Sequence, residues 1–298
     1  MKRDLVSISD LSKADIEEML ALSLAMRTAP PSDSCKGLIL ASCFFEPSTR
    51  TRLSFEAAML RLGGSVIGFS ESETTSAKKG ESLADTMRVI GAYCDIAVIR
   101  HPREGSARDA AESCSKPVIN AGDGANQHPT QTLLDLFSIR ECQGKIDDLS
   151  IAIAGDLKHS RTVHSLALAL AHYAVRLYFI SPESLRLPDG CAGELRKKGV
   201  KFSFHETLEE VMPKADVLYM TRVQKERFEA PMTQIPLLKK SHLAKTKPNL
   251  RILAPLPRLE EVDVAIDAMP QAYYFQQAQN GLYVRMALLE TLLGRVSV

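Results

Sequence analysis

Three hydroxyl side chains and a guanidinium stand together where a helix is expected to begin. Ser48, Thr49, Arg50 and Thr51 follow the apolar run 38–45 and precede apolar residues at helical spacing. A helix N-terminus offers unpaired N–H groups and positive dipole charge, and a guanidinium can hold two phosphate oxygens. This group therefore predicts a phosphate site that needs no glycine-rich loop. The alternative is that Ser48 or Thr49 only caps the helix while Arg50 and Arg52 are solvated.

Two more polar groups follow strand-like runs in the first half of the chain. Arg100 comes directly after the run 95–99, so it is a second candidate for binding a phosphate or carbonyl oxygen, although it could be a solvated strand end. His128 and Gln131 stand one turn apart at an expected helix start, where both can face one small polar ligand. His128 could instead cap that helix or pack in the loop. The G-D-G fragment 122–124 lacks the third glycine of a dinucleotide site.

The second half offers cations and exposed carbonyl groups. Arg161 lies between an expected strand and an expected helix, where it could also be a solvated first-turn residue. Arg222 and Gln224 lie on one face of an extended segment, within a basic run of a kind that is usually surface. Pro255 and Leu256 belong to the stretch A-P-L-P-R. Proline has no N–H, so this stretch exposes carbonyls that can accept from an NH2 or ammonium group.

Alternating strand-like and helical patterns predict an α/β fold with mostly parallel sheets flanked by helices. The strands are expected at 38–45, 65–69, 95–99, 117–119, 149–154, 175–180, 200–204, 216–220 and 250–253. Helices are expected to start near Thr51, Glu81, Ser106, Pro129, Ser160, Asp189 and Thr207, and a long one should run from about Gln277 to Leu293. The polar residues 141–148 are typical of a domain connection. In such folds, binding sites gather at the carboxyl ends of the strands.

Length and composition narrow the function classes. A length of 298 residues suggests about two domains. The net charge of +1 provides no general field for nucleic acid or an anionic membrane, and we expect neither as a partner. The six cysteines are scattered without C-x-x-C or zinc-finger spacing, which favours a reducing compartment and no metal site. With no apolar run of bilayer length and no signal peptide, we expect a cytoplasmic enzyme.

The segment 44–56 reads F-F-E-P-S-T-R-T-R-L-S-F-E, and it resembles the carbamoyl-phosphate signature of the aspartate and ornithine carbamoyltransferase family. The resemblance continues to Q-Q-A-Q-N-G at 276–281. It implies transfer of the carbamoyl group of carbamoyl phosphate to L-aspartate, giving N-carbamoyl-L-aspartate and phosphate in de novo pyrimidine biosynthesis, without a cofactor. It also implies a carbamoyl-phosphate domain (1–140 plus 277–298), an aspartate domain (141–276), a last helix that packs on the first domain, and a homotrimer.

The resemblance also assigns roles in the first domain. The residues that would bind carbamoyl phosphate are Ser48, Thr49, Arg50, Thr51, Arg100, His128 and Gln131. His128 would donate to the carbonyl oxygen as that oxygen gains charge, and Gln131 would contact the carbamoyl NH2. Ser76 and Lys79 match a loop that enters the active site of a neighbouring subunit, where Lys79 would also contact aspartate.

In the second domain, the resemblance implies that Arg161 binds one carboxylate of aspartate and that Arg222 and Gln224 bind the other. The carbonyls of Pro255 and Leu256 would contact the carbamoyl group in the reaction intermediate. The sequence departs from the usual His-Pro-Leu-Pro-Arg of aspartate enzymes because position 254 is Ala, which puts local rigidity and affinity in question. The His-Cys-Leu-Pro motif of ornithine enzymes is missing, so aspartate is favoured.

Three other functions stay open at this point. The chain could be a carbamoyltransferase for another amino acid, or a weakly active copy that serves as a scaffold or regulatory partner. A dinucleotide-binding oxidoreductase is a more distant third. Regulatory chains are a further possible partner on which the sequence is silent.

Overall fold

The computed structural model describes residues 4–71, 76–223 and 236–295, without the side chains of residues 76 and 77. The chain divides into two compact units, residues 1–134 with 279–298 and residues 135–278. We call them unit 1 and unit 2. Within the described residues, no helix combines the length and the apolar character that a membrane crossing requires.

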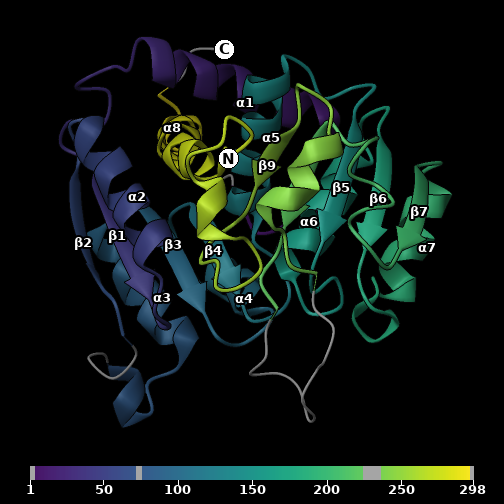
Figure 1. Ribbon diagram of the computed structural model, residues 1–298. Coiled ribbons are helices and arrows are strands. Elements are labelled where there is room, and N and C mark those ends of the chain that lie inside the picture. The colour runs from purple at the N-terminus through teal and green to yellow at the C-terminus, as the bar shows by residue number, and fades with distance from the viewer. Residues whose placement is uncertain (1–3, 72–75, 224–235, 296–298) are drawn as a thin grey trace. The chain divides into compact units, whose positions relative to one another are not determined.

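Unit 1 contains a parallel sheet of four strands in the order β2-β1-β3-β4, as the arrows in Figure 1 show. The strands are β1 (Ile39–Phe44), β2 (Ser65–Phe69), β3 (Ile96–His101) and β4 (Val118–Asp123). Their positions confirm the strand predictions for this half. The N-terminal segment adds to the sheet beside β4, where Leu5 bridges to Ile119 in parallel. Since β1 has β2 on one side and β3 on the other, the strand order reverses at β1.

The helices of unit 1 begin after a serine, after Gly105 or at proline. They are α1 (Lys13–Thr28), α2 (Thr49–Arg61), α3 (Leu83–Tyr93), α4 (Ser106–Ser113) and the start of α5 (Pro129–Gln143). The predicted starts of α2, α3, α4 and α5 lie within two residues of those observed. Helix α1 was not predicted, although Ser12 and Asp15 form a capping box at its N-terminus. The chain returns to unit 1 through α8 (Tyr274–Leu292).

Unit 2 contains a parallel sheet of five strands in the order β7-β6-β5-β8-β9. The strands are β5 (Ser150–Ala154), β6 (Arg176–Ile180), β7 (Lys201–His205), β8 (Val217–Met220) and β9 (Arg251–Leu253), all at the predicted places. Helices α6 (Arg161–Leu170) and α7 (Asp189–Lys197) begin where they were expected. The order reverses at β5, which has β6 on one side and β8 on the other.

Two expectations about elements are corrected by the structure. The helix predicted near Thr207 is wrong, because residues 208–214 form turns whose apolar side chains pack in the core. Pro213 lacks the N–H that a continuing helix would use and disfavours helical geometry at the residue before it. The polar stretch 141–148 is only partly a connection, because residues 141–143 complete the last turn of α5.

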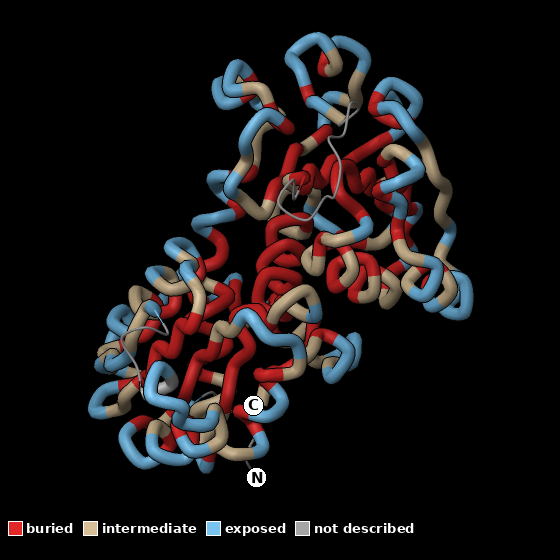
Figure 2. Tube along the Cα trace, turned by 90° about the horizontal axis from the view of Figure 1, so that it is seen from below, coloured by how far each residue is buried: buried red, intermediate tan, exposed pale blue. Residues whose placement is uncertain are grey.

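The cores of both units consist of strand residues and the inner faces of the helices (Figure 2, red). All six cysteines are free, and four of them are buried: Cys35, Cys43, Cys94 and Cys114. Burial raises the pKa of the Cys94 thiol to about 11, so that it stays protonated and packs as a small apolar side chain.

Candidate active site

The predicted phosphate site lies between β1 and α2. Ser48 is the N-cap residue of α2, but its side chain makes no capping hydrogen bond to the helix. The reading in which Ser48 only caps the helix is therefore wrong. Thr49 and Arg50 are exposed in the first turn, Thr51 is buried, and that turn contains no acidic residue. The helix N-terminus and its hydroxyls thus remain suited to an anion.

Arg50 and Arg100 are brought together although they are fifty positions apart. Arg50 is exposed overall, but partial desolvation of its guanidinium lowers its pKa, and the positive charge of Arg100 lowers it further. The pKa of Arg100 is also lowered, mainly by burial, while the carboxylate of Glu46 opposes this shift. Two guanidinium groups close enough for the charge of Arg100 to act on Arg50 attract a phosphate strongly.

The sheet explains why these two arginines converge. Phe44 at the end of β1 pairs with Arg100 at the end of β3, and the backbone N–H of Phe45 donates to the Arg100 carbonyl at 2.8 Å. The Arg100 side chain is held by an ion pair from Nε to Glu46 Oε1 (2.7 Å) and by a hydrogen bond from Nη1 to the Ala121 carbonyl (3.3 Å). The site therefore lies at the point where the strand order reverses, which is the expected position in an open parallel sheet.

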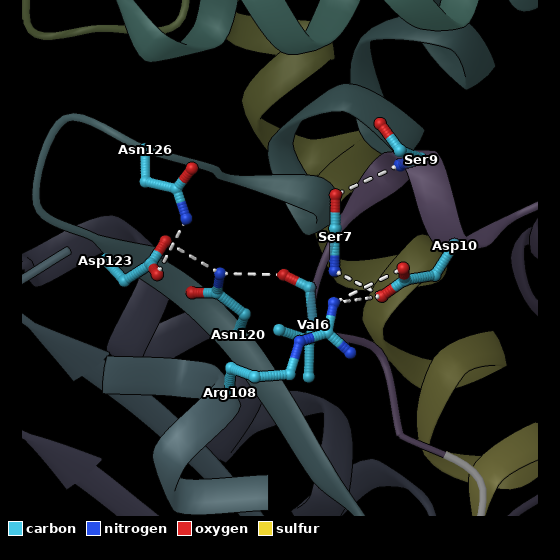
Figure 3. Close-up of polar contacts among 8 residues, drawn as sticks. All are labelled: Val6, Ser7, Ser9, Asp10, Arg108, Asn120, Asp123 and Asn126. Atoms are coloured by element: carbon cyan, nitrogen blue, oxygen red, sulfur yellow. Dashed lines mark hydrogen bonds and ion pairs between the residues drawn. The ribbon is translucent and has the colours of Figure 1, made fainter. Parts of the chain in front are cut away.

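The buried carboxylate of Asp123 holds the loop that leads to His128, and Figure 3 shows its contacts with Asn120 and Asn126. Oδ1 of Asp123 accepts from the Asn120 side chain at 3.0 Å and from the backbone N–H of Gln127 at 3.1 Å. Oδ2 accepts from the backbone N–H of Gly105 at 3.0 Å and from the Asn126 side chain at 3.1 Å. Four donors on one carboxylate fix the loop before α5. The sequence marked Asp123 only as a turn residue.

The same network includes the N-terminal segment of the chain (Figure 3). The Asn120 side chain also donates to the Val6 carbonyl at 2.9 Å, and Arg108 forms an ion pair with Asp10 at 3.0 Å. The Asp123 carboxylate and the Val6 carbonyl are thus linked through a single amide. These contacts tie residues 6–10 to the end of β4 and to α4.

His128 and Gln131 are both buried at the start of α5, one turn apart. The backbone N–H of Gln131 donates to the His128 carbonyl at 3.0 Å, so the two residues share one turn. Between them lies Thr130, whose buried hydroxyl has no hydrogen-bond partner among the described residues. Thr130 was not among the site residues predicted from the sequence.

The loop predicted to act across a subunit interface contains Ser76 and Lys79, which form the short helix η3 (Ser76–Lys79). Lys79 is exposed, and among the described residues no hydrogen bond or ion pair joins it to Arg50 or Arg100. The Ser76 side chain is not described. The single chain therefore leaves this loop apart from the group around Arg50.

In unit 2, the predicted acceptor residues follow β5 and β8, at the reversal of the strand order. Gly155, directly after β5, has φ +121°, and a Cβ there would lie 2.2 Å from the Thr221 carbonyl oxygen. Only glycine permits this approach, because the carbonyl is backbone and cannot move aside. The segments that carry Arg161 and Arg222 are therefore in close contact.

Hydroxyl groups join these two segments. Oγ of Ser160, the N-cap residue of α6, lies 3.0 Å from the Thr162 hydroxyl and 2.9 Å from the Thr221 hydroxyl. Arg161 and Arg222, each directly next to one of these residues, are half-buried. Gln224 lies outside the described residues.

Pro255 and Leu256 follow β9 and are half-buried. Leu256 has φ +50°, which is unfavourable for a leucine and has to be maintained by the surrounding structure. On one side, the backbone N–H of Ala254 donates to Gln277 Oε1 at 2.8 Å. On the other, Arg258 pairs with the Asp267 carboxylate.

The described residues contain no group of three or more His, Cys, Asp or Glu side chains placed to hold a metal ion. In unit 1 they contain two guanidinium groups beside a helix N-terminus, and a buried histidine and amide at the start of α5. In unit 2 they contain two half-buried arginines and the half-buried residues Pro255 and Leu256. This set can bind a phosphorylated group and a dicarboxylate, and can stabilise negative charge on a carbonyl oxygen.

Comparison with known proteins agrees with this arrangement. Residues 3–141 match the family model described as aspartate/ornithine carbamoyltransferase, carbamoyl-P binding domain, and residues 147–292 match the one for the Asp/Orn binding domain. The chain is 52% identical over 297 residues to the aspartate carbamoyltransferase catalytic subunit of Chromobacterium violaceum, and the match covers 98% of each protein.

Solved structures are similar over nearly the whole chain. The catalytic subunit of M. jannaschii aspartate transcarbamoylase superposes with a TM-score of 0.92 at 48% identity, covering 99% of this chain and 98% of that one. Aspartate transcarbamoylase from Trypanosoma cruzi, in complex with carbamoyl phosphate and aspartate, gives 0.89 at 38% identity, covering 97% and 96%. Both halves of the sequence and the whole fold thus agree, and the chain belongs to the aspartate/ornithine carbamoyltransferase family.

Proposed function

We propose that this protein is the catalytic chain of an aspartate carbamoyltransferase, which makes N-carbamoyl-L-aspartate and phosphate in de novo pyrimidine biosynthesis. The observation that carries the proposal is the convergence of Arg50 and Arg100 beside the uncapped N-terminus of α2. Relatives that bear this activity are similar over the whole chain, and the T. cruzi relative was crystallised with carbamoyl phosphate and aspartate.

In the proposed reaction, the phosphate group binds to Ser48, Thr49, Arg50 and Thr51. The amino nitrogen of aspartate attacks the carbamoyl carbon, a C–N bond forms, and the carbonyl oxygen gains negative charge. Arg100 and His128 stabilise that oxygen, which is the largest contribution expected of such a site. The C–O bond to phosphate then breaks, and phosphate leaves with the electron pair and the proton that the amine releases.

Gln131 contacts the carbamoyl NH2, and the carbonyl groups of Pro255 and Leu256 accept hydrogen bonds from the carbamoyl group in the intermediate. No protein nucleophile is needed, because phosphate is already a good leaving group. Orientation of the two substrates and stabilisation of the developing charge account for the catalysis.

Aspartate is bound through its two carboxylates, one by Arg161 and the other by Arg222 with Gln224. A guanidinium holds a carboxylate through paired hydrogen bonds, and two arginines suit a dicarboxylic amino acid. Their support is the contact between the segments after β5 and β8. In this proposal, residues 1–140 with 277–298 form the carbamoyl-phosphate domain and residues 141–276 form the aspartate domain.

The proposal includes a homotrimer in which Ser76 and Lys79 complete the active site of a neighbouring subunit. Its support is the outer edge of the unit 1 sheet. Strand β2 is exposed or half-buried at every residue, whereas parallel strands are normally covered on both faces. Large apolar side chains are exposed on α2, β2 and α3: Leu53, Leu60, Ile67, Val89 and Tyr93. A second copy of the chain would cover such a surface.

Two finer points belong to the same proposal. We place the enzyme in the cytoplasm, which agrees with six free cysteines. Regulatory chains are possible additional partners. Sedimentation of the pure chain tests the assembly, because a trimer has three times the mass of the 32.8 kDa chain.

The decisive experiment is a colorimetric ureido assay with carbamoyl phosphate and a panel of amino acids. The proposal expects product with L-aspartate and little with ornithine, glutamate or asparagine. Product with another amino acid alone would reassign the acceptor, and no product with any of them would favour a scaffold role.

A further inference from the structure

Asp135 is a fully buried carboxylate on α5 that takes no part in the proposed chemistry, and it lies one turn after Gln131. Its Oδ1 accepts a hydrogen bond from Gln277 Nε2 at 2.6 Å, and its Oδ2 accepts one from the Tyr219 hydroxyl at 2.9 Å. Both donors are themselves buried within unit 2. The tyrosine leads to the segments that carry the predicted aspartate-binding arginines, and the glutamine leads to the carbonyls predicted to contact the carbamoyl group.

The first branch leads to the carbonyls after β9. Gln277 Oε1 accepts the backbone N–H of Ala254 at 2.8 Å, which fixes the orientation of the amide and points its NH2 to Asp135. Pro255 follows directly, and Leu256 is held at its unfavourable positive φ. A side chain of α8 thus connects Asp135 to the start of the segment whose carbonyls would bind the carbamoyl group.

The second branch leads to the two arginines. Tyr219 lies on β8, two residues before Thr221 and on the same face of the strand. Burial, and then the negative charge of Asp135, raise the pKa of Tyr219 well above its usual value, so the hydroxyl stays protonated and donates. Tyr219 also hydrogen-bonds the Thr162 side chain.

From Thr162 the contacts continue through hydroxyl groups. Ser160 Oγ lies 3.0 Å from the Thr162 hydroxyl and 2.9 Å from that of Thr221. Arg161 stands between Ser160 and Thr162, and Arg222 follows Thr221. We name the connected set the Asp135 network; its members are Asp135, Gln277, Ala254, Tyr219, Thr162, Ser160 and Thr221.

We propose that Asp135 is a positioning residue that holds the aspartate-binding segments of Arg161 and Arg222 and the carbamoyl-contacting segment Pro255–Leu256 in one fixed geometry. The inference rests on the proposed function, because it uses the acceptor roles given there. A carboxylate suits this task because it accepts at both oxygens, so one buried group can hold a tyrosine and a glutamine at the same time. Small displacements of such supporting groups reduce rates severely.

The test uses Tyr219→Phe and Gln277→Met in the full chain, because both keep the shape of the side chain and remove its hydrogen bonds. Loss of a hydrogen bond to a charged group changes an equilibrium constant by roughly tenfold or more. Tyr219→Phe should therefore raise KM for aspartate at least about tenfold, while Kd for carbamoyl phosphate alone, measured by calorimetry, changes less than about twofold. Gln277→Met should lower kcat at least about tenfold.

Asp135→Asn should combine both effects, and adding Tyr219→Phe to it should change KM by less than about threefold, because the two residues act through one contact. The matched control is Tyr178→Phe. Tyr178 is a buried tyrosine on β6, separated from β8 by β5, and its ring contacts those of His205 and the Arg176 side chain. It should leave KM and kcat unchanged.

The outcomes separate this inference from the proposed function. If wild-type protein is active with aspartate but Tyr219→Phe and Gln277→Met only lower the unfolding temperature, Asp135 is structural and the inference is wrong. If Asp135→Asn does not fold, the two single variants decide. If wild-type protein forms no ureido product with aspartate, the proposed function fails first and the acceptor role of the network fails with it.

Discussion

Replacing Arg50 by alanine tests the phosphate site most directly. At about 4 Å and an effective dielectric constant of about 20, a guanidinium and one unit of phosphate charge attract by about 4 kcal/mol. Arg50 is exposed, so screening by salt reduces this energy. Since each ~1.4 kcal/mol is a factor of ten, we expect kcat/KM to fall roughly 100- to 1,000-fold in the ureido assay.

The stability of the Arg50→Ala variant without bound phosphate should not fall with its activity. Burial and the charge of Arg100 disfavour the charged Arg50 side chain in the folded protein, and alanine has the highest helix propensity. The unfolding temperature of Arg50→Ala in phosphate-free buffer should therefore equal or exceed that of the wild type. Phosphate at 100 times its wild-type Kd should stabilise the wild type by about 2.7 kcal/mol and the variant far less.

Arg52→Ala is the matched control, because it removes the same charge from the same helix. Arg52 pairs with Glu56 at 3.7 Å, one turn further along α2. It should retain most of the activity and the stabilisation by phosphate. If Arg50→Ala keeps near-normal turnover at saturating substrate, or if Arg52→Ala loses as much, the anion site has been assigned to the wrong residues.

Three further predictions address the acceptor, the departure at position 254 and the assembly. Arg222→Ala should raise KM for aspartate far more than Kd for carbamoyl phosphate, and equal losses measured by kinetics and calorimetry would place Arg222 in the wrong half. Ala254→His should change kcat/KM by less than about tenfold, since position 254 contributes its backbone N–H; a gain of several orders of magnitude would mark the natural chain as impaired. Mixed trimers reassembled from inactive Arg50→Ala and Lys79→Ala chains should regain close to one working site each, and persistent inactivity of verified mixtures would refute a shared site.

The sequence was sufficient to predict most of the elements whose signal lies in neighbouring residues. The nine strands within the described residues were all predicted, because short apolar runs between polar loops have the length of buried strands. The convergence of Arg50 and Arg100 then followed from parallel strands that end at one edge of a sheet. Helix α1 was missed although Ser12 and Asp15 gave a local signal, whereas the turns before Pro213 were read as a helix because their buried residues have helical spacing.

The supporting networks could not be predicted, because their members are distant in sequence. Asp135 meets Tyr219 across 84 positions and Gln277 across 142. A lone acid in the apolar segment after His128 gives no indication of which donors will meet it. Asp123 is a milder case: its position between two glycines indicated a turn, but the turn alone does not show that four donors meet its carboxylate.

The unused capping position at Ser48 limits how stable this protein can become. An acidic N-cap would satisfy the first amides of α2 and strengthen the helix by about 1 kcal/mol, which is a routine gain in thermostability engineering. Here it would place a permanent negative charge where the substrate has to bind. Selection for heat resistance alone would therefore favour substitutions at position 48 that reduce turnover. A library of variants made to raise the unfolding temperature should therefore keep Ser48. Its stabilising substitutions should lie far from β1 and α2.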